Sequence, residues 1–199
     1  MWWWLLLFAS AVFAATPPKQ QSETYHAFAD QRPCCAIPNA ADVVSNAAFL
    51  VVGAFKFLEA THLSARLFAA GVTATAVGSA YYHWLPTTSR LVWDRLPMTL
   101  AFGAAFHEPL CLHPCVSAAV GVGTVLYWSA TSDLRAYAVF QYGGLACVLV
   151  SGTHRSALLL YGAAKACEAL DRPLFAWSGH RVSGHTLKHL LAAVACALV

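Results

Sequence analysis

Seven apolar stretches of near-spanning length follow one another along this chain, separated by short polar breaks. They cover approximately residues 40–59, 65–86, 89–110, 114–131, 134–152, 155–170 and 183–199. A helix needs about 20 predominantly apolar residues to cross a hydrocarbon core of about 30 Å. Several stretches are shorter than this, so their number constrains the fold more firmly than their ends do. The pattern predicts an all-helical, multi-pass integral membrane protein, a bundle of seven transmembrane helices over residues 39–199.

The charge content agrees with a chain that lies in a bilayer. Of its 199 residues, 59% are hydrophobic and 11% are charged, whereas soluble domains carry about 25% charged residues. The formal net charge of +3 is spread over scattered Lys and Arg side chains, with no basic run and no glycine-rich phosphate loop. These features exclude a nucleic-acid-binding protein and make the membrane the expected partner.

The seven cysteines form no CxxC pair, and several lie inside apolar runs, where a thiol behaves as a small hydrophobic side chain. Cys34 with Cys35, and Cys111 with Cys115, lie near segment ends. A disulfide or a minor metal site therefore stays open at these two places. None of the functional predictions depends on them.

Two further segments precede the seven stretches. Residues 1–15 are apolar, and small residues come just before the break at Pro17 and Pro18. This segment is either a signal peptide or an eighth membrane helix, because it ends as signals do but lacks their positively charged start. Residues 16–38 are polar and interrupted by prolines, which predicts an extramembrane segment.

Short connections decide which ends of the predicted helices meet. Breaks such as 86–88 and 131–133 cannot recross a bilayer, so neighbouring helices run antiparallel. The start of the first helix, the end of the second and the starts of the third and seventh therefore lie at one membrane face. These places hold Ser45, Asn46, Ser79, His83, Asp94, His185 and His189. Buried ionisable groups are costly in a membrane unless they are paired or functional, so one shared site would explain their convergence.

Three of these residues have the chemistry of metal ligands. His185 and His189 lie one helical turn apart on one face, behind the capping residue Ser183. Two imidazoles at this spacing can hold one metal ion, and His83 would supply a third. Three protein ligands leave one tetrahedral position of zinc open, which is typical of a catalytic site. Asp94 would reach that open position if the chain turns back. The sequence therefore predicts a Zn²⁺ site.

Each of these residues also has a structural alternative. Alone, His185 and His189 would be helix-end histidines that contact headgroups or backbone carbonyls. Ser79 would be a small residue at a helix contact. Asp94 would be the ion-pair partner of a neighbouring arginine, or a first-turn charge that favours the helix dipole.

A second possible metal cluster follows the third stretch. Its members are His107, Glu108, His113 and Cys115. Because successive helices alternate in direction (helix parity), this cluster lies at the membrane face opposite His83. The two groups therefore cannot share one ion.

The polar motifs together resemble the alkaline ceramidase family, within a superfamily of seven-helix membrane hydrolases that includes the adiponectin-type receptors. The matching pieces are Ser45-Asn46, Ser79-x-x-x-His83, Asp94 in Trp93-Asp94-Arg95-Leu96-Pro97-Met98, and His185-x-x-x-His189. They stand in the family's order and cover the chain from about residue 39 onward. The resemblance implies that the three histidines hold zinc, that Asp94 orients or deprotonates the bound water, and that Ser79 supports the site.

The resemblance also implies hydrolysis of a lipid amide such as ceramide, which gives a fatty acid and a free sphingoid base. Zinc suits this reaction because it lowers the pKa of its bound water from 15.7 to about 7 and polarises the amide carbonyl. Asp94 would then act as general base and acid toward the leaving amine. Ser79 would donate a hydrogen bond to the oxyanion, an interaction whose loss typically costs about 2.7 to 4 kcal/mol.

The chain departs from the family before the first helix. Animal ceramidases place several carboxylates for a calcium ion there, whereas this chain offers only Asp30, Asn39 and Asp42. Ca²⁺ as a second cofactor is therefore in doubt. The inferred substrate is in doubt for the same reason, where the family's amino-terminal segment shapes the pocket.

Two other functions stay open from the sequence. A non-catalytic receptor-like or scaffolding protein would keep the zinc to tie the second, third and seventh helices together. A membrane haem carrier would need His83 opposite one of the other two histidines. His185 and His189 share one helix face and cannot occupy both sides of a haem.

Overall fold

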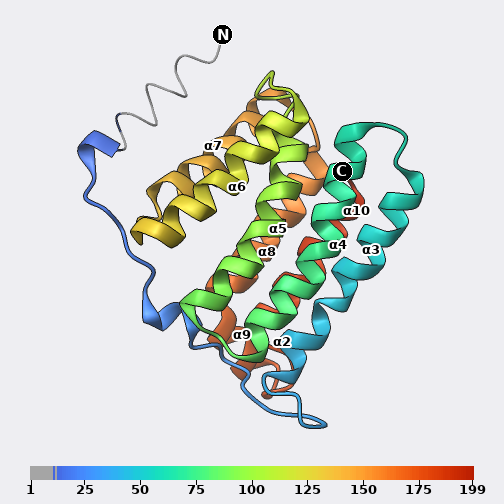
Figure 1. The fold of residues 1–199 in the computed structure, drawn as a ribbon. Coiled ribbons are helices and arrows are strands. Elements are labelled where there is room, and N and C mark those ends of the chain that lie inside the picture. Colours follow the sequence, from blue (N-terminus) through green and yellow to red (C-terminus); the bar gives the residue numbers. More distant parts are fainter. Residues whose placement is uncertain (1–10, 12) are drawn as a thin grey trace.

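A computed structural model of the chain describes residue 11 and residues 13–199, and this part is all-helical apart from an isolated β-bridge between Cys34 and Ile37. The long helices lie side by side in a bundle (Figure 1). The elements are η1 (Glu23–His26), α2 (Ala40–Ser45), α3 (Ala47–Glu59), α4 (Leu63–Trp84), α5 (Thr88–Phe106), α6 (Pro114–Thr131), α7 (Arg135–Ser151), α8 (Arg155–Ala169), α9 (Asp171–Trp177) and α10 (Gly184–Ala197). The all-helical prediction is confirmed for these residues.

Six of the predicted apolar stretches coincide, within a few residues, with single helices, namely α4 to α8 and α10. The first stretch is divided into α2 and α3 at Asn46. There the Asn46 side chain donates a 2.7 Å hydrogen bond to the carbonyl oxygen of Asp42 and so competes with the backbone ladder. The short helices η1 and α9 are not anticipated by the pattern, because with 4 and 7 residues they are far shorter than a membrane-spanning stretch.

The number of membrane crossings is less firmly supported than the helices themselves. Among the described residues, one helical run, from Ala40 to Glu59, is long and apolar enough to cross a membrane. Helices α7, α8 and α10 have 17, 15 and 14 residues, fewer than the roughly 20 that a straight crossing needs. A seven-span location in the membrane therefore stays a prediction.

Small and aromatic residues form the centre of the bundle. Helix α4 packs between α3 and α5, and α10 packs between α8 and α3. Phe49, Phe68 and Val72 meet Ala192 and Ala193 in this core. The α6–α7 hairpin lies to one side of it, at the left in Figure 1. Alanines at so many contacts let the helix backbones approach closely.

Two glycines permit the closest helix contacts near the polar end of the bundle. A Cβ atom on Gly78 would collide with the carbonyl oxygen of Trp93, where α4 meets α5. A Cβ atom on Gly184 would collide with the carbonyl oxygen of Cys167, where α10 meets α8. Each glycine lies next to a site residue predicted from the sequence, so these contacts fix where Ser79 and His185 are placed.

The segment predicted to be extramembrane, residues 16–38, covers the end of the bundle where α4 ends and α10 begins. The Leu134 amide donates to the carbonyl oxygen of Lys19 at 2.8 Å. His26 bonds the Tyr82 hydroxyl at 2.8 Å, and Phe28 is buried. The predicted signal peptide or eighth helix at residues 1–15 lies largely outside the described residues, which include only 11 and 13–15 of it.

We expect Gly78→Ala to lower the melting temperature of the detergent-purified protein. The added methyl group must separate α4 from the Trp93 carbonyl, and overpacking of this kind costs about 1 to 3 kcal/mol. Gly123→Ala is the matched control, because Gly123 is an exposed helical glycine and a Cβ atom added there would meet no heavy atom within 4 Å. That change should stabilise α6 by about 0.5 to 1 kcal/mol. Equal melting temperatures for the two variants would contradict the close α4–α5 contact.

Candidate metal centre

The three predicted histidines meet at one end of the bundle. His83 lies in the last turn of α4, and His185 and His189 lie in the first two turns of α10. Ser183 caps α10 by accepting a 3.0 Å hydrogen bond from the amide of Thr186. All three imidazoles are almost fully enclosed, with exposed fractions of 1%, 3% and 2%.

The spacing of the ring nitrogens fits a single metal ion. One ligand nitrogen from each histidine lies within 4.8 Å of the other two. Nε2 of His83 and Nε2 of His185 are 3.3 Å apart. Ligand nitrogens at 2.0–2.1 Å around tetrahedral zinc would be about 3.3 to 3.4 Å apart. This group can therefore hold a metal ion, and the His83–His185 pair already has the spacing that zinc needs.

The hydrogen bonds around His189 leave its Nε2 atom free to bind a metal ion. The hydroxyl of Ser45 donates its one proton to the carbonyl oxygen of Asp42 at 3.1 Å. Its oxygen must then accept from Nδ1 of His189, 2.8 Å away. That bond assigns the proton to Nδ1 and leaves a lone pair on Nε2, which has no hydrogen-bond partner among the described residues. Partners of this kind orient metal-binding histidines in many proteins.

Two backbone contacts hold the other histidines. The side chain of Asn39 donates to the carbonyl oxygen of His83 at 2.8 Å. One oxygen of Asp171 accepts from the amide of His185 at 2.8 Å, and its other oxygen accepts from the amide of Ala29 at 2.8 Å. Helices α4 and α10 are thereby tied to the segment that covers them.

Phe28 closes the centre from the side of that segment. Its ring centroid lies 4.7 Å from the ring centroid of His83 and 4.3 Å from that of His185. The side chain is buried. An apolar ring at this position keeps bulk water away from the triad, so access to the centre must come from another direction.

A buried ion-pair group lies beside the triad. Nζ of Lys188 is 2.9 Å from Oε1 of Glu168 and 3.3 Å from Nε2 of His185. Glu168 also pairs with Lys165 on the same helix, α8. A metal ion at the triad and the Lys188 ammonium would repel each other, and the Glu168 carboxylate offsets that repulsion.

Asp94 and Ser79 form a contact of their own across α4 and α5. Both are buried, and the Ser79 hydroxyl donates a hydrogen bond to the Asp94 carboxylate. Among the described residues, neither Arg90 nor Arg95 forms a salt bridge with Asp94. Arg90 stacks instead on Tyr81, with 4.2 Å between the guanidinium carbon and the ring centroid. The ion-pair alternative for Asp94 is therefore not what the structure shows.

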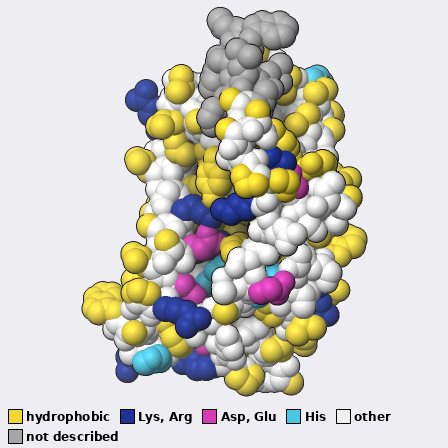
Figure 2. All heavy atoms as spheres, turned by 90° about the vertical axis from the view of Figure 1, so that its left-hand side faces the viewer, with side chains coloured by type: hydrophobic (Ala, Val, Ile, Leu, Met, Phe, Trp, Pro, Cys, Tyr) yellow, Lys and Arg dark blue, Asp and Glu magenta, His cyan; other side chains and the backbone are white. Residues whose placement is uncertain are grey.

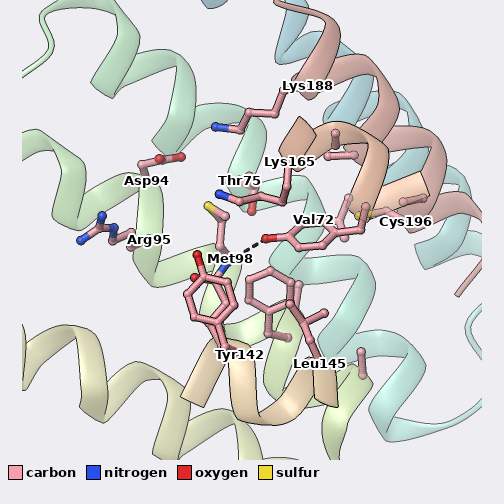
Figure 3. Close-up of a pocket in the computed structure, with 18 of the residues that line it drawn as sticks. Val72, Thr75, Asp94, Arg95, Met98, Tyr142, Leu145, Lys165, Lys188 and Cys196 are labelled. Carbon is pink, nitrogen blue, oxygen red and sulfur yellow. Dashed lines mark hydrogen bonds between the residues drawn. The ribbon is translucent and has the colours of Figure 1, made fainter. Parts of the chain in front are cut away.

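A cavity of about 420 Å³ connects this polar group to the interior of the bundle. Ser79, Asp94 and His189 line one end of it. The walls farther along are mainly apolar and include Val72, Met98, Phe102, Phe106, Leu145 and Val148. In Figure 3 the side chains of Asp94, Lys165 and Lys188 point into the same space above Met98. The shape and lining suit an amphiphile with its polar group at the histidine end.

The three residues considered for calcium have other partners, although Oδ2 of Asp42 has no hydrogen-bond partner among the described residues. The Asp30 carboxylate is bound by Arg32 at 2.6 Å, and these hydrogen bonds hold the pKa of Asp30 below its usual value. Asp42 accepts from the Thr186 hydroxyl at 2.7 Å, and the Asn39 amide nitrogen bonds His83. Among the described residues, the one group of three or more His, Cys, Asp or Glu side chains positioned for a metal is the histidine triad.

The second cluster considered from the sequence lies far from the triad. His107 and Glu108 line a separate cavity together with His62. His62 precedes α4 and His83 lies in its last turn, and 22 residues of α-helix span about 33 Å. His107 and Glu108 therefore cannot share an ion with His83, in agreement with helix parity.

Sequence reasoning did not single out Phe28, Asp171, Lys165, Glu168 or Lys188. The last three carried a usable signal, because ionisable residues within apolar stretches are rare and mark functional sites. Phe28 and Asp171 gave no such signal. They acquire their importance from segments that fold over the end of the bundle.

Comparison with family models, with curated proteins and with solved structures found no match to this chain.

Replacement of any one triad histidine by alanine should abolish stable metal binding. Wild-type protein purified with Zn²⁺ should hold about one zinc per chain, because three neutral imidazoles provide a tetrahedral site with one open position. Elemental analysis after dialysis should then show almost no zinc in His83→Ala or His189→Ala. His180→Ala is the control, since that ring is exposed and outside the triad. Full zinc content in His83→Ala would refute the three-histidine centre.

Proposed function

We propose that this protein is a membrane-embedded, zinc-dependent amidohydrolase that cleaves the amide bond of ceramide or a related N-acyl lipid. The observation that carries the proposal is the cavity, which reaches the buried histidine triad at His189 and joins it and the buried Asp94 to an apolar chamber. A long-chain amide would place its acyl chain in the chamber and its carbonyl beside Asp94 and His189. The order of the polar motifs, which resembles that of the alkaline ceramidases, supports the same reaction.

The outer surface supports a location within lipid. Large apolar side chains are strongly exposed on several helices, among them Leu58 (83%), Val77 (70%), Val150 (77%) and Leu159 (76%). Water-soluble monomers rarely expose large apolar patches. A bilayer would cover these side chains, and the shorter helices would be accommodated by local thinning of the bilayer.

The residues present fit a zinc ion. Three buried, convergent imidazoles with one position left open match the ligand set of hydrolytic zinc sites. When bound, zinc supplies a Lewis acid for the carbonyl and makes water a strong nucleophile near neutral pH.

Asp94 is the residue that we assign to proton transfer. It lines the cavity beside His189 and is free of a salt bridge among the described residues. It would take a proton from the attacking water and deliver it to the leaving nitrogen. Ser79 donates to Asp94, so we assign it to orienting this carboxylate in place of the oxyanion role inferred from the sequence.

The geometry favours a small ion over a haem. The three imidazole centroids are 4.8 Å from one another in all three pairs. A haem would have to enter between rings that already contact each other. A scaffolding protein with a purely structural zinc needs no chamber beside the metal, and the cavity lined by Asp94 therefore favours the hydrolase.

Asp94→Asn should reduce amide hydrolysis at least 100-fold while leaving zinc content and melting temperature close to wild type, since general acid and base catalysis contributes about 10² to 10⁴ in rate. Release of fatty acid from ceramides and N-acylethanolamines by metal-loaded protein measures this. Glu59→Gln is the control, because Glu59 is an exposed carboxylate outside the cavity. If wild-type protein cleaves none of these lipids, and zinc removal only lowers its melting temperature, the metal is structural and the proposal fails.

The protein should fractionate as an integral membrane protein. Alkaline carbonate, which strips peripheral proteins, should leave it in the pellet, and a mild detergent should release it. The physical reason is the exposed apolar surface of α3, α4, α7 and α8. Quantitative release by carbonate alone would contradict the proposed location.

A further inference from the structure

The buried wall of the cavity carries more positive than negative charge. Glu168 is the one carboxylate that pairs with both Lys165 and Lys188. Asp94 and Arg95 line the same cavity. These buried or half-buried groups comprise three cations and two carboxylates, which leaves one positive charge without a partner. Figure 2 shows basic and acidic side chains close together around a hollow near the middle of this face.

Arg95 is the cation that lacks a counter-ion. Its exposed fraction is 7%, and no carboxylate of the described residues lies within salt-bridge distance of it. Nη2 donates to Oε1 of Gln21 at 2.8 Å, whereas Nη1 has no hydrogen-bond partner among the described residues. A buried guanidinium with an unused donor and no anion is costly unless a ligand completes it.

Aromatic rings hold this guanidinium in place. Its central carbon lies 4.3 Å from the ring centroid of Trp128 and 4.7 Å from that of Tyr137. Tyr25 lies on another side, at 5.7 Å. These contacts fix the planar fork of donors before any ligand arrives, so an anion that binds it pays little ordering entropy.

We infer that the substrate carries a carboxylate on the amine half of its amide, and that Arg95 binds this carboxylate. The substrate class is then an N-acyl amino acid, and this inference rests on the proposed amide hydrolysis. It differs from hydrolysis of ceramide, whose amine half is uncharged.

The position of Arg95 indicates that the carboxylate belongs to the amine half of the substrate and not to the acyl half. Arg95 follows Asp94 directly on α5, and in Figure 3 the two side chains leave the helix in different directions, with Asp94 toward Lys188 and Arg95 away from it. With the amide carbonyl beside Asp94 and the acyl chain in the apolar part of the cavity, the groups attached to the amide nitrogen would extend toward Arg95, which lines the same cavity. In an N-acyl amino acid, two atoms separate the amide carbonyl carbon from the carboxylate carbon. The far end of the cavity, where the acyl chain would lie, is lined by Phe106, Leu145 and Val148.

The charge of the ligand follows from the same accounting. A carboxylate is a monoanion and can neutralise the Arg95 guanidinium, from whose fork it accepts two parallel hydrogen bonds. The reaction is a hydrolysis without a redox step. The amide C–N bond breaks, a C–O bond to water forms, and the nitrogen takes up both protons of that water, so the products are a fatty acid carboxylate and a zwitterionic amino acid.

Paired substrates test the inference on full-length, zinc-loaded protein in a neutral detergent. N-palmitoylglycine and N-palmitoylethanolamine share an acyl chain and an amide, and they differ in having a carboxylate or a hydroxyl group. Wild-type kcat/KM should be at least tenfold higher for N-palmitoylglycine. Arg95→Gln should remove this preference, chiefly by raising KM for N-palmitoylglycine. Lys165→Gln, which keeps the Lys188–Glu168 pair, should narrow the preference by lowering the local positive charge.

Arg90→Gln is the matched control on the same helix. Arg90 stacks on Tyr81 and does not line the cavity, so this variant should keep the wild-type preference. The inference is wrong if wild-type protein cleaves the ethanolamide as well as the glycine amide. It is also wrong if Arg95→Gln lowers kcat/KM for the glycine amide and for the ethanolamide by the same factor. The Lys165→Gln result decides the question if Arg95→Gln does not fold.

A binding experiment separates failure of this inference from failure of the proposed function. Asp94→Asn protein should bind N-palmitoylglycine at least tenfold more tightly than N-palmitoylethanolamine, as followed by tryptophan fluorescence. If no amide is hydrolysed by wild type yet this preference exists and Arg95→Gln abolishes it, the anion site stands and the hydrolase does not. If palmitate competes as strongly as N-palmitoylglycine, Arg95 binds an acyl carboxylate, and the assignment to the amine half is overturned.

Discussion

Burial of three neutral imidazoles around one point is the constraint on which the rest of this structure depends. Their ring nitrogens converge within 4.8 Å in a region almost closed to solvent. Polar groups enclosed in this way are costly unless each finds a partner. Ser45 satisfies Nδ1 of His189 at 2.8 Å and leaves Nε2 of His189 without a partner among the described residues. Nε2 of His185 lies 3.3 Å from both Nε2 of His83 and Nζ of Lys188. The helices must therefore keep α4 and α10 in fixed register, and the glycines at their contacts allow this.

The segment before the bundle completes the centre. Phe28 covers two of the imidazoles, and Ala29 shares Asp171 with the amide of His185. Asp30 and Arg32 form an ion pair, and Arg32 also donates to the carbonyl oxygen of Arg181 at 3.0 Å, in the loop that leads to α10. The same residues that close the triad to water thus position the start of α10. Arg32 also binds the carboxylate of Asp30, which a calcium ion would need as a ligand.

The cavity has apolar walls along most of its length and charged side chains at one end. Its apolar walls suit an acyl chain, and its polar end brings a carboxylate, two lysines and an arginine close to the triad. Charges in a low-dielectric interior act strongly on one another, so an unpaired cation there discriminates between ligands more sharply than one at a surface. Under the proposed function, the excess positive charge at this end would act on the choice of substrate and not on bond cleavage.

The sequence alone determined the helices and the end of the bundle at which the site lies. Apolar runs separated by short breaks enforce antiparallel neighbours, and parity alone brought Ser79, His83, Asp94, His185 and His189 to one end. The sequence could not determine which ring nitrogens converge, that Ser79 bonds Asp94, or that Arg95 has no anion, because these depend on rotamers and on distances across helix contacts. Only the tertiary structure decided them, since a periodic pattern specifies which face of a helix is buried but not which atoms meet there.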